Sequence, residues 1–273
     1  MRNHRVLDDP AVLHLHDHVA WCGARNDELE RVAITAFSVG AARNERMIFV
    51  CDDPNAYELR ANDELDRALD SGALTSSSID EVYGDVETFD PDAQLAVFSA
   101  AVDDALAAGY TGIRVVADNT PLVCGDDESF QLWLAWEQLT DGFQDRRPVL
   151  GLCFFDASRI PADRLAVLGA VHPITHASSP PFRLFTDDGV VVLIGEVDDE
   201  TVDTLHRALA VRPVDPQTIV VDVSRAEFID HRTLQAFARL GTDIAPVRLR
   251  GVHPTLRRLW RTLDLTTDDL QFS

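Results

Sequence analysis

The amino-acid sequence predicts an α/β protein: a parallel sheet covered by helices, followed by a second, smaller α/β domain. Apolar runs of strand length alternate with segments of helical periodicity along the chain. The runs are apolar at nearly every position, as expected for strands buried on both faces. Residues 177–181 (ASSPP) interrupt the pattern, because consecutive prolines stop a helix or a central strand. We therefore expect one domain over residues 1–180 and another over residues 182–273.

The first domain contains alternating strand and helix patterns. Four apolar runs predict strands, at residues 19–22, 47–51, 113–117 and 149–155. Apolar residues at helical spacing predict helices over residues 29–37, 91–106 and 127–140. Asp90 and Pro91 are suited to the cap and first turn of the middle helix, and Gly109 is suited to its end.

The second domain shows the same alternation over a shorter length. Strands are predicted at residues 190–194, 218–223 and 247–250, the last half-exposed because arginine alternates with apolar residues. Helices are predicted over residues 202–209, from Asp230 to Gly241, and from Pro254 onward.

The charge of the chain excludes several classes of function. The formal net charge is −22, and all 24 cationic side chains are arginines. Without lysine, neither a Schiff-base mechanism nor the lysine of a phosphate-binding P-loop is available. Residues 1–180 carry 31 acidic residues and 13 arginines, a net charge of −18. Residues 182–273 carry 15 acidic residues and 11 arginines, a net charge of −4. Such acidity repels phosphates, so we expect neither nucleic acid nor an anionic membrane as partner.

The sequence also predicts a cytoplasmic protein. No window approaches the about 20 consecutive apolar residues of a membrane span, and the start MRNHRVLDDP lacks the apolar core of a secretory signal. The four cysteines are scattered, with no CxxC pair, as is usual for buried thiols in a reducing compartment.

The sequence offers two candidate cofactor sites, one for a nucleotide and one for a metal ion, and it disfavours both. The loop after the first strand reads CGARNDEL, with one glycine and no lysine, although Asp118 follows a strand as a Walker B acid would. His14, His16 and His18 would face one side of a strand, as metal ligands must. The later His172 and His176 lie beyond the last strand, so we expect no metal or other cofactor and consider His18 alone to matter.

The order of motifs in residues 12–176 resembles the MEDS sensory domain. The resemblance rests on His18 before the first strand, GYTGIR at 109–114, the Trp136-Glu137 pair, CFFD at 153–156, and His172-Pro173. It implies a RecA-like fold and signal reception without catalysis. The pocket residues that it implies are the following: His18, Arg114, Asp118, Glu137, Asp156 and His172. The alternative for Arg114 is an ordinary ion pair with Glu137 or Asp156.

Residues 182–273 resemble a STAS domain, the fold of anti-sigma factor antagonists. The shared stretches are LIGEVD at 193–198, VDVS at 221–224 with FID at 228–230, and LRGV at 249–252. In that family, a serine or threonine at the turn after the aspartate is phosphorylated, which switches partner binding. Here the turn reads Asp230, His231, Arg232, Thr233, with arginine at the acceptor position. We expect the switch to be degenerate, with Asp230 as a helix cap and Thr233 as a displaced acceptor in the alternative case.

Arginines form one basic patch near the end of the chain: Arg248, Arg250, Arg257, Arg258 and Arg261. A solvated face is the simplest explanation. Docking on the acidic first domain, or on an acidic partner, is the functional one.

The combined features predict a cytoplasmic, non-catalytic regulator of transcription. The first domain would receive a small-molecule or protein signal, and the STAS-like domain would bind an anti-sigma factor or related switch protein. The alternative is a degenerate ATP-binding protein of RecA/KaiC-like ancestry. The sequence leaves the oligomeric state open, with a homodimer as one option.

Overall fold

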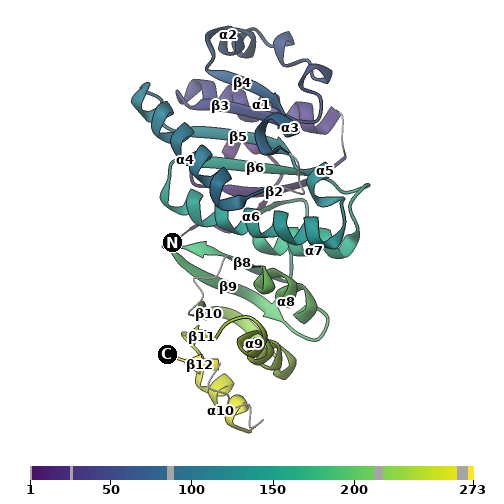
Figure 1. Ribbon diagram of the computed structural model, residues 1–273, viewed down its shortest axis with the longest axis vertical. Coiled ribbons are helices and arrows are strands. Elements are labelled where there is room, and N and C mark those ends of the chain that lie inside the picture. Colours follow the sequence, from purple (N-terminus) through teal and green to yellow (C-terminus); the bar gives the residue numbers. More distant parts are fainter. Residues whose placement is uncertain (1, 25–26, 85–88, 212–217, 263–269) are drawn as a thin grey trace.

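Two sheets follow one another along the long axis of the molecule in the computed structural model (Figure 1). The structure describes residues 2–24, 27–84, 89–211, 218–262 and 270–273. Within them, a seven-stranded sheet is followed by a five-stranded one. The α/β class predicted from the sequence is confirmed, with helices covering a parallel first sheet and a second, mixed sheet after it.

The first sheet is parallel throughout. Its strands are, in spatial order, β1 (Arg5–Leu7), β7 (Ile174–His176), β2 (His18–Gly23), β6 (Val149–Asp156), β5 (Ile113–Asp118), β3 (Arg46–Cys51) and β4 (Leu74–Ser78). Strands β2, β6, β5 and β3 are the four predicted, and they form the centre. Their side chains alternate between two cores: Ala20 and Cys153 face one side, and Val19 and Leu152 face the other.

Helices cover both faces of this sheet. On one face lie α1 (Asp27–Ala42) and α2 (Asp63–Ser71), which share a core with Val19 and Leu152. The opposite face is covered by α4 (Pro91–Ala107), α6 (Asp127–Arg146) and α7 (Ala162–Val171), beside the short α3 (Ile79–Tyr83) and α5 (Thr120–Val123). The cap of α4 is as predicted: the Asp90 carboxylate accepts from the amides of Asp92 and Ala93, and Gly109 follows with φ of 91°. Helix α6 continues past the predicted end at residue 140.

The second sheet has the order β12 (Leu270–Phe272), β11 (Val247–Arg250), β10 (Ile219–Ile229), β9 (Val190–Val197), β8 (Phe182–Asp187). Among the strand pairs of this sheet in the described residues, β8 and β9 are antiparallel and the other pairs are parallel. Asp188 and Gly189 join them with positive φ at both residues, the conformation of a two-residue hairpin turn.

The helices of this domain are α8 (Val202–Ala210), α9 (His231–Asp243) and α10 (Pro254–Thr262). Strand β10 runs past the predicted end at residue 223, because two register shifts let it continue beside β9.

Helices α6 and α7 lie between the two sheets (Figure 1). Their outer sides contact β8 and α8, and one apolar core continues from the first domain into the second. The Gln138 side-chain amide donates to the carbonyl of Ala208, and Arg207 pairs with Asp163 at 2.6 Å. None of the helices in the described part of the chain has the length and apolar character needed to cross a membrane.

Candidate functional site

Four chemically active side chains meet between the first sheet and the helices α6 and α7. His18 begins β2, Cys153 lies on the neighbouring β6, Glu137 is on α6, and His172 directly follows α7. All four are buried. Strand alternation puts His18 and Cys153 on the same face of the sheet, because Ala20, two residues after His18, is opposite Cys153.

Glu137 is at the centre of this cluster. Its Oε2 lies 3.2 Å from Nε2 of His18, 3.4 Å from Sγ of Cys153 and 3.5 Å from Nε2 of His172. Sγ of Cys153 lies 3.6 Å from Nε2 of His18. Oε1 of the same carboxylate accepts from the indole N–H of Trp133 at 2.8 Å and from the amide of Asn119 at 3.1 Å. The carboxylate is therefore held from several sides.

Both histidines are oriented by a second contact. Nδ1 of His18 lies 3.2 Å from a carboxylate oxygen of Asp141, and Nδ1 of His172 lies 2.7 Å from the carbonyl oxygen of Leu168. These oxygens only accept, so each Nδ1 carries a hydrogen and each Nε2 faces the cluster. The two rings lie 4.0 Å apart between centroids.

The ionisation of the cluster follows from burial and from these contacts. Burial alone would lower the pKa of His18, but its hydrogen bonds to Asp141 and Glu137 outweigh burial and raise it. Burial opposes the charge of Glu137, yet its contacts with His172 and His18 hold its pKa far below the usual value. Burial raises the pKa of the Cys153 thiol, and burial together with the charge of His18 lowers the pKa of His172. These shifts favour the charged forms of Glu137 and His18 and the neutral forms of His172 and Cys153.

The structure gathers three of the six pocket residues implied by the MEDS resemblance. His18, Glu137 and His172 are together, whereas Arg114, Asp118 and Asp156 are not. Strand alternation explains the difference, because the side chains of Arg114, Asp118 and Asp156 face the side of the sheet covered by α1, whereas Cys153 faces the other side. Arg114 donates from Nε to Glu45 at 2.6 Å, so it forms an ordinary ion pair, as in the alternative, but with Glu45 in place of Glu137 or Asp156.

Asp118 and Asp156 organise the turns that follow their strands. Oδ1 of Asp118 accepts from the amide of Thr120 at 3.1 Å. Oδ1 of Asp156 accepts from the amide and hydroxyl of Ser158 at 3.0 and 2.6 Å.

The sequence did not single out Cys153 or Asp141 as site residues. The signal for Cys153 was its position within a buried strand next to the one that His18 begins. Asp141 lies four residues after Glu137 and therefore on the same face of α6, a spacing that was available from the sequence.

His14, His16 and His18 do not lie on one side of a single strand. His14 and His16 are exposed and precede β2, which begins at His18, so no strand orders them at period two. The disfavoured nucleotide loop CGARNDEL includes residues 25 and 26, which lie outside the described residues.

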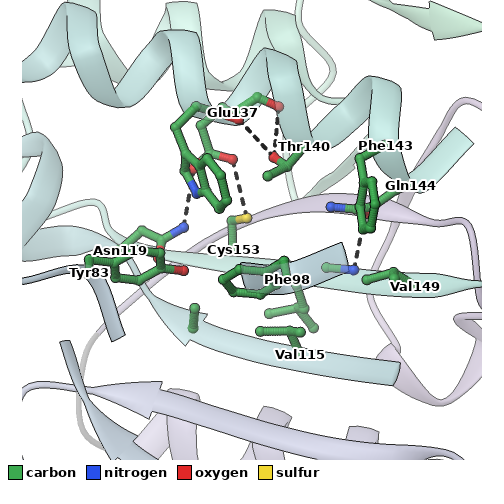
Figure 2. A pocket seen from close by; sticks show the side chains of 14 residues that line it. Tyr83, Phe98, Val115, Asn119, Glu137, Thr140, Phe143, Gln144, Val149 and Cys153 are labelled. Carbon is green, nitrogen blue, oxygen red and sulfur yellow. Dashed lines mark hydrogen bonds between the residues drawn. The ribbon is translucent and has the colours of Figure 1, made fainter. Parts of the chain in front are cut away.

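A mostly apolar cavity adjoins the cluster (Figure 2). Its volume is about 40 Å³, where a single water needs about 10–15 Å³. Figure 2 shows the Cys153 thiol pointing toward Glu137, with Asn119 to the left of the thiol and Phe98 and Val115 below it. Within the described part of the chain, Oδ1 of Asn119 is buried without a hydrogen-bond partner. The cavity has room for a ligand of a few heavy atoms.

The family model of the MEDS domain, the methanogen/methylotroph, DcmR sensory domain, matches residues 17–173. This match covers more than half of the chain. The chain belongs to the MEDS family. The expected resemblance of the first domain is thereby confirmed, and the match indicates a role in signalling. No curated protein matches the chain.

The MEDS region includes the whole buried cluster, whose members lie between His18 and His172. It also includes Asp141, which reaches out of the region. The second carboxylate oxygen of Asp141 accepts from the backbone amide of Thr186 on β8 at 2.6 Å. Arg2 binds the first oxygen at 2.5 Å and also donates to the Thr186 carbonyl oxygen. Asp141 therefore links the buried cluster to the second domain.

The turn before α9 lies beyond the MEDS region. Asp230 caps the helix, as expected, by accepting from the amide of Thr233 at 2.8 Å. Thr233 is fully buried, and its hydroxyl lies 2.8 Å from the Asp230 carboxylate and 3.2 Å from the Val197 carbonyl oxygen. His231 and Arg232 are exposed, and Arg232 pairs with Asp199 across a surface groove between α8 and α9.

Proposed function

We propose that this chain is a cytoplasmic, non-catalytic signalling regulator. Its MEDS domain receives a small molecule, and its second domain, similar to STAS domains, binds an anti-sigma factor or a related switch protein and so controls transcription. The observation that carries the proposal is the contact of Asp141, which touches both the buried His18 and the backbone of β8. The four cysteines are free, as is usual in a reducing compartment.

The cavity suggests the chemical class of the signal. A ligand would have an apolar body against Phe98 and Val115 and one donor group for the unpartnered oxygen of Asn119. With about four heavy atoms, binding is limited to about −6 kcal/mol. That corresponds to a Kd no tighter than about 40 µM. A sensor of this kind responds to a compound that is abundant.

A small alcohol tests the cavity. We expect 1-propanol to shift the NMR signals of residues around Cys153 in the full-length protein. Val115→Ile adds a methylene toward the cavity and should weaken this response, whereas Val116→Ile adds the same group on the opposite face and should leave it unchanged. If the two variants respond like the wild type, or if 1-propanol produces no shifts, the cavity is not the ligand site.

The partner-binding surface is proposed at the turn before α9 and the groove beside it. His231 and Arg232 are exposed at this turn, and Arg239 and His206 line the groove. The burial of Thr233 supports a binding surface without a phosphorylation switch, because a kinase would have to open the turn to reach the hydroxyl. Arg232 at the usual acceptor position supports the same conclusion.

Binding of the full-length protein to the anti-sigma kinases of the same genome tests this surface. We expect one of them to bind, with at least a tenfold loss in Arg232→Glu. Arg261→Glu, an equal charge change on the exposed side of α10, should bind like the wild type. Incubation with the bound kinase and ATP should leave Thr233 unlabelled. The proposal fails if none of these kinases binds the wild-type chain.

A further inference from the structure

We infer that His18, Glu137, Cys153 and His172 form a binding site for one Zn²⁺ ion, with the two Nε2 atoms, Oε2 and Sγ as ligands. Imidazole, carboxylate and thiolate are the ligand types that zinc takes in proteins. The four ligand atoms all lie within 4.8 Å of one another. This inference goes beyond the proposed signalling function and does not depend on it.

The spacing of the ligand atoms fits a tetrahedral ion. With zinc about 2.0–2.1 Å from nitrogen or oxygen and about 2.3 Å from sulfur, tetrahedral edges are about 3.3 Å, and about 3.6 Å where sulfur takes part. The distances from Glu137 Oε2 to the two histidine nitrogens are 3.2 and 3.5 Å. Those from Sγ of Cys153 to Oε2 and to Nε2 of His18 are 3.4 and 3.6 Å. Four edges of the tetrahedron are therefore in place.

The orientation of His172 is the second observation. Its Nδ1–H donates to the Leu168 carbonyl, so its Nε2 faces the cluster. This Nε2 is buried, lies 3.5 Å from Oε2 of Glu137, and has no hydrogen-bond partner among the described residues. A buried polar atom without a partner is unfavourable, and a cation between Nε2 and the carboxylate would bind both.

The surroundings match those of protein zinc sites. Ligand histidines usually donate their other nitrogen to a carboxylate or a backbone carbonyl, and Asp141 and Leu168 supply these two acceptors. Zinc with one thiolate, one carboxylate and two neutral imidazoles has no net charge, which suits full burial. The ligands come from β2, α6, β6 and the end of α7, so the ion would tie both helices to the sheet.

Metal analysis of the untagged full-length protein tests the site. We expect about one zinc per chain, and its loss in Cys153→Ser and His172→Gln. Cys51→Ser, another buried strand cysteine, and His176→Gln, the next histidine along the chain, should retain it. Asp141→Asn should weaken zinc binding by about 10–100-fold, whereas Asp145→Asn should not. Zinc retained by both ligand variants would overturn the inference.

Cobalt substitution makes the test independent of the stability of the variants. Wild-type protein that has been treated with a chelator and given Co²⁺ should show the visible bands of a tetrahedral ion together with a thiolate-to-cobalt charge-transfer band. Circular dichroism would verify the fold. A folded chain that neither contains zinc nor takes up Co²⁺ would refute the site. The four side chains would then be held together by hydrogen bonds without a metal ion.

Discussion

Glu137 is the buried residue that contacts each of the other members of the cluster. A buried carboxylate is costly unless it is neutralised and hydrogen-bonded. Glu137 meets both conditions through Trp133 and Asn119 on one oxygen and through His18 and Cys153 on the other. The same arrangement on a smaller scale occurs at Glu28, which accepts from the indole of Trp21 at 3.0 Å but is partly exposed.

These two glutamates form a matched pair for mutation. Glu137→Gln keeps an acceptor for Trp133 but removes one of the two carboxylates that contact the buried His18, the other being Asp141. We expect a loss of about 3–5 kcal/mol in the free energy of unfolding, measured by urea denaturation. Glu28→Gln keeps the corresponding indole contact in a more exposed place and should cost about 1 kcal/mol or less. Equal losses would mean that burial and the histidines add nothing.

Arg114 gives a second prediction at the scale of single residues. It is fully buried, pairs with Glu45, and donates from Nη2 to the Leu13 carbonyl at 3.3 Å. Arg114→Met leaves Glu45 buried and unpaired, so we expect a loss of about 3–5 kcal/mol in urea denaturation. Adding Glu45→Gln should recover a large part of this loss. No recovery in the double variant would show that the guanidinium has another essential partner.

At the scale of elements, the sequence predicted the centre of each sheet and missed the edges. The central strands of the first sheet are long apolar runs, and their order along the chain was clear. Strands β1 and β7 have three residues each, too short for a periodic pattern. Strand β8 was missed although Asp188 and Gly189 lie between two apolar segments, a hairpin signal present in the sequence.

Half of the predicted site residues lie together in the structure, and strand alternation would have excluded the others. His18, Glu137 and His172 came from the family resemblance. The same resemblance also implied Arg114 and Asp156, and alternation along β5 and β6 places both on the opposite face from Cys153. The approach of β8 to Asp141 depends on the packing of two domains, which one-dimensional patterns do not contain.

Helix α6 carries two carboxylates that each bind a backbone amide of the second domain. Asp141 accepts from Thr186 at 2.6 Å and also contacts His18, whereas Asp145 accepts from Gly189 at 2.9 Å. We expect Asp141→Asn to speed hydrogen exchange of the Thr186 amide by about tenfold or more, because a charge-assisted hydrogen bond contributes about 1.5–3 kcal/mol.

Asp145→Asn is the control for this experiment. It should change the exchange of Gly189 alone and leave the signals of the buried cluster as they are. Asp141→Asn should alter both β8 and the cluster. If the two substitutions affect the cluster equally, or if Asp141→Asn leaves Thr186 protected, Asp141 does not couple the cluster to the second domain.

The whole molecule is organised around the face between α6, α7 and the second domain. From the sequence, a solvated face was the simplest explanation for the late arginines, and docking on the acidic first domain or on an acidic partner was the functional alternative. In the structure, Arg257 and Arg248 contact the chain end through the Ser273 carbonyl and Gln271 instead. The described contacts between the domains use α8 and β8, and β8 lies at the other edge of the second sheet, so they do not support the alternative of docking through the arginine patch. That patch is left for solvent or for a partner.

Arg2 is the charged residue at the centre of the domain interface. Its buried guanidinium binds Asp141 of the MEDS domain and the Thr186 carbonyl of β8, and its amide donates to Asp187 at 2.8 Å. Since the domains also share a continuous apolar core, we expect the wild-type chain to unfold in one calorimetric transition. Arg2→Met leaves Asp141 with less compensation at the interface and should split this transition in two, with the second domain melting first. Arg5→Met removes an arginine that is a third exposed and lies 3.7 Å from Asp17, and it should keep a single transition. One unchanged transition in Arg2→Met would mean that Arg2 is not needed to hold the two domains together.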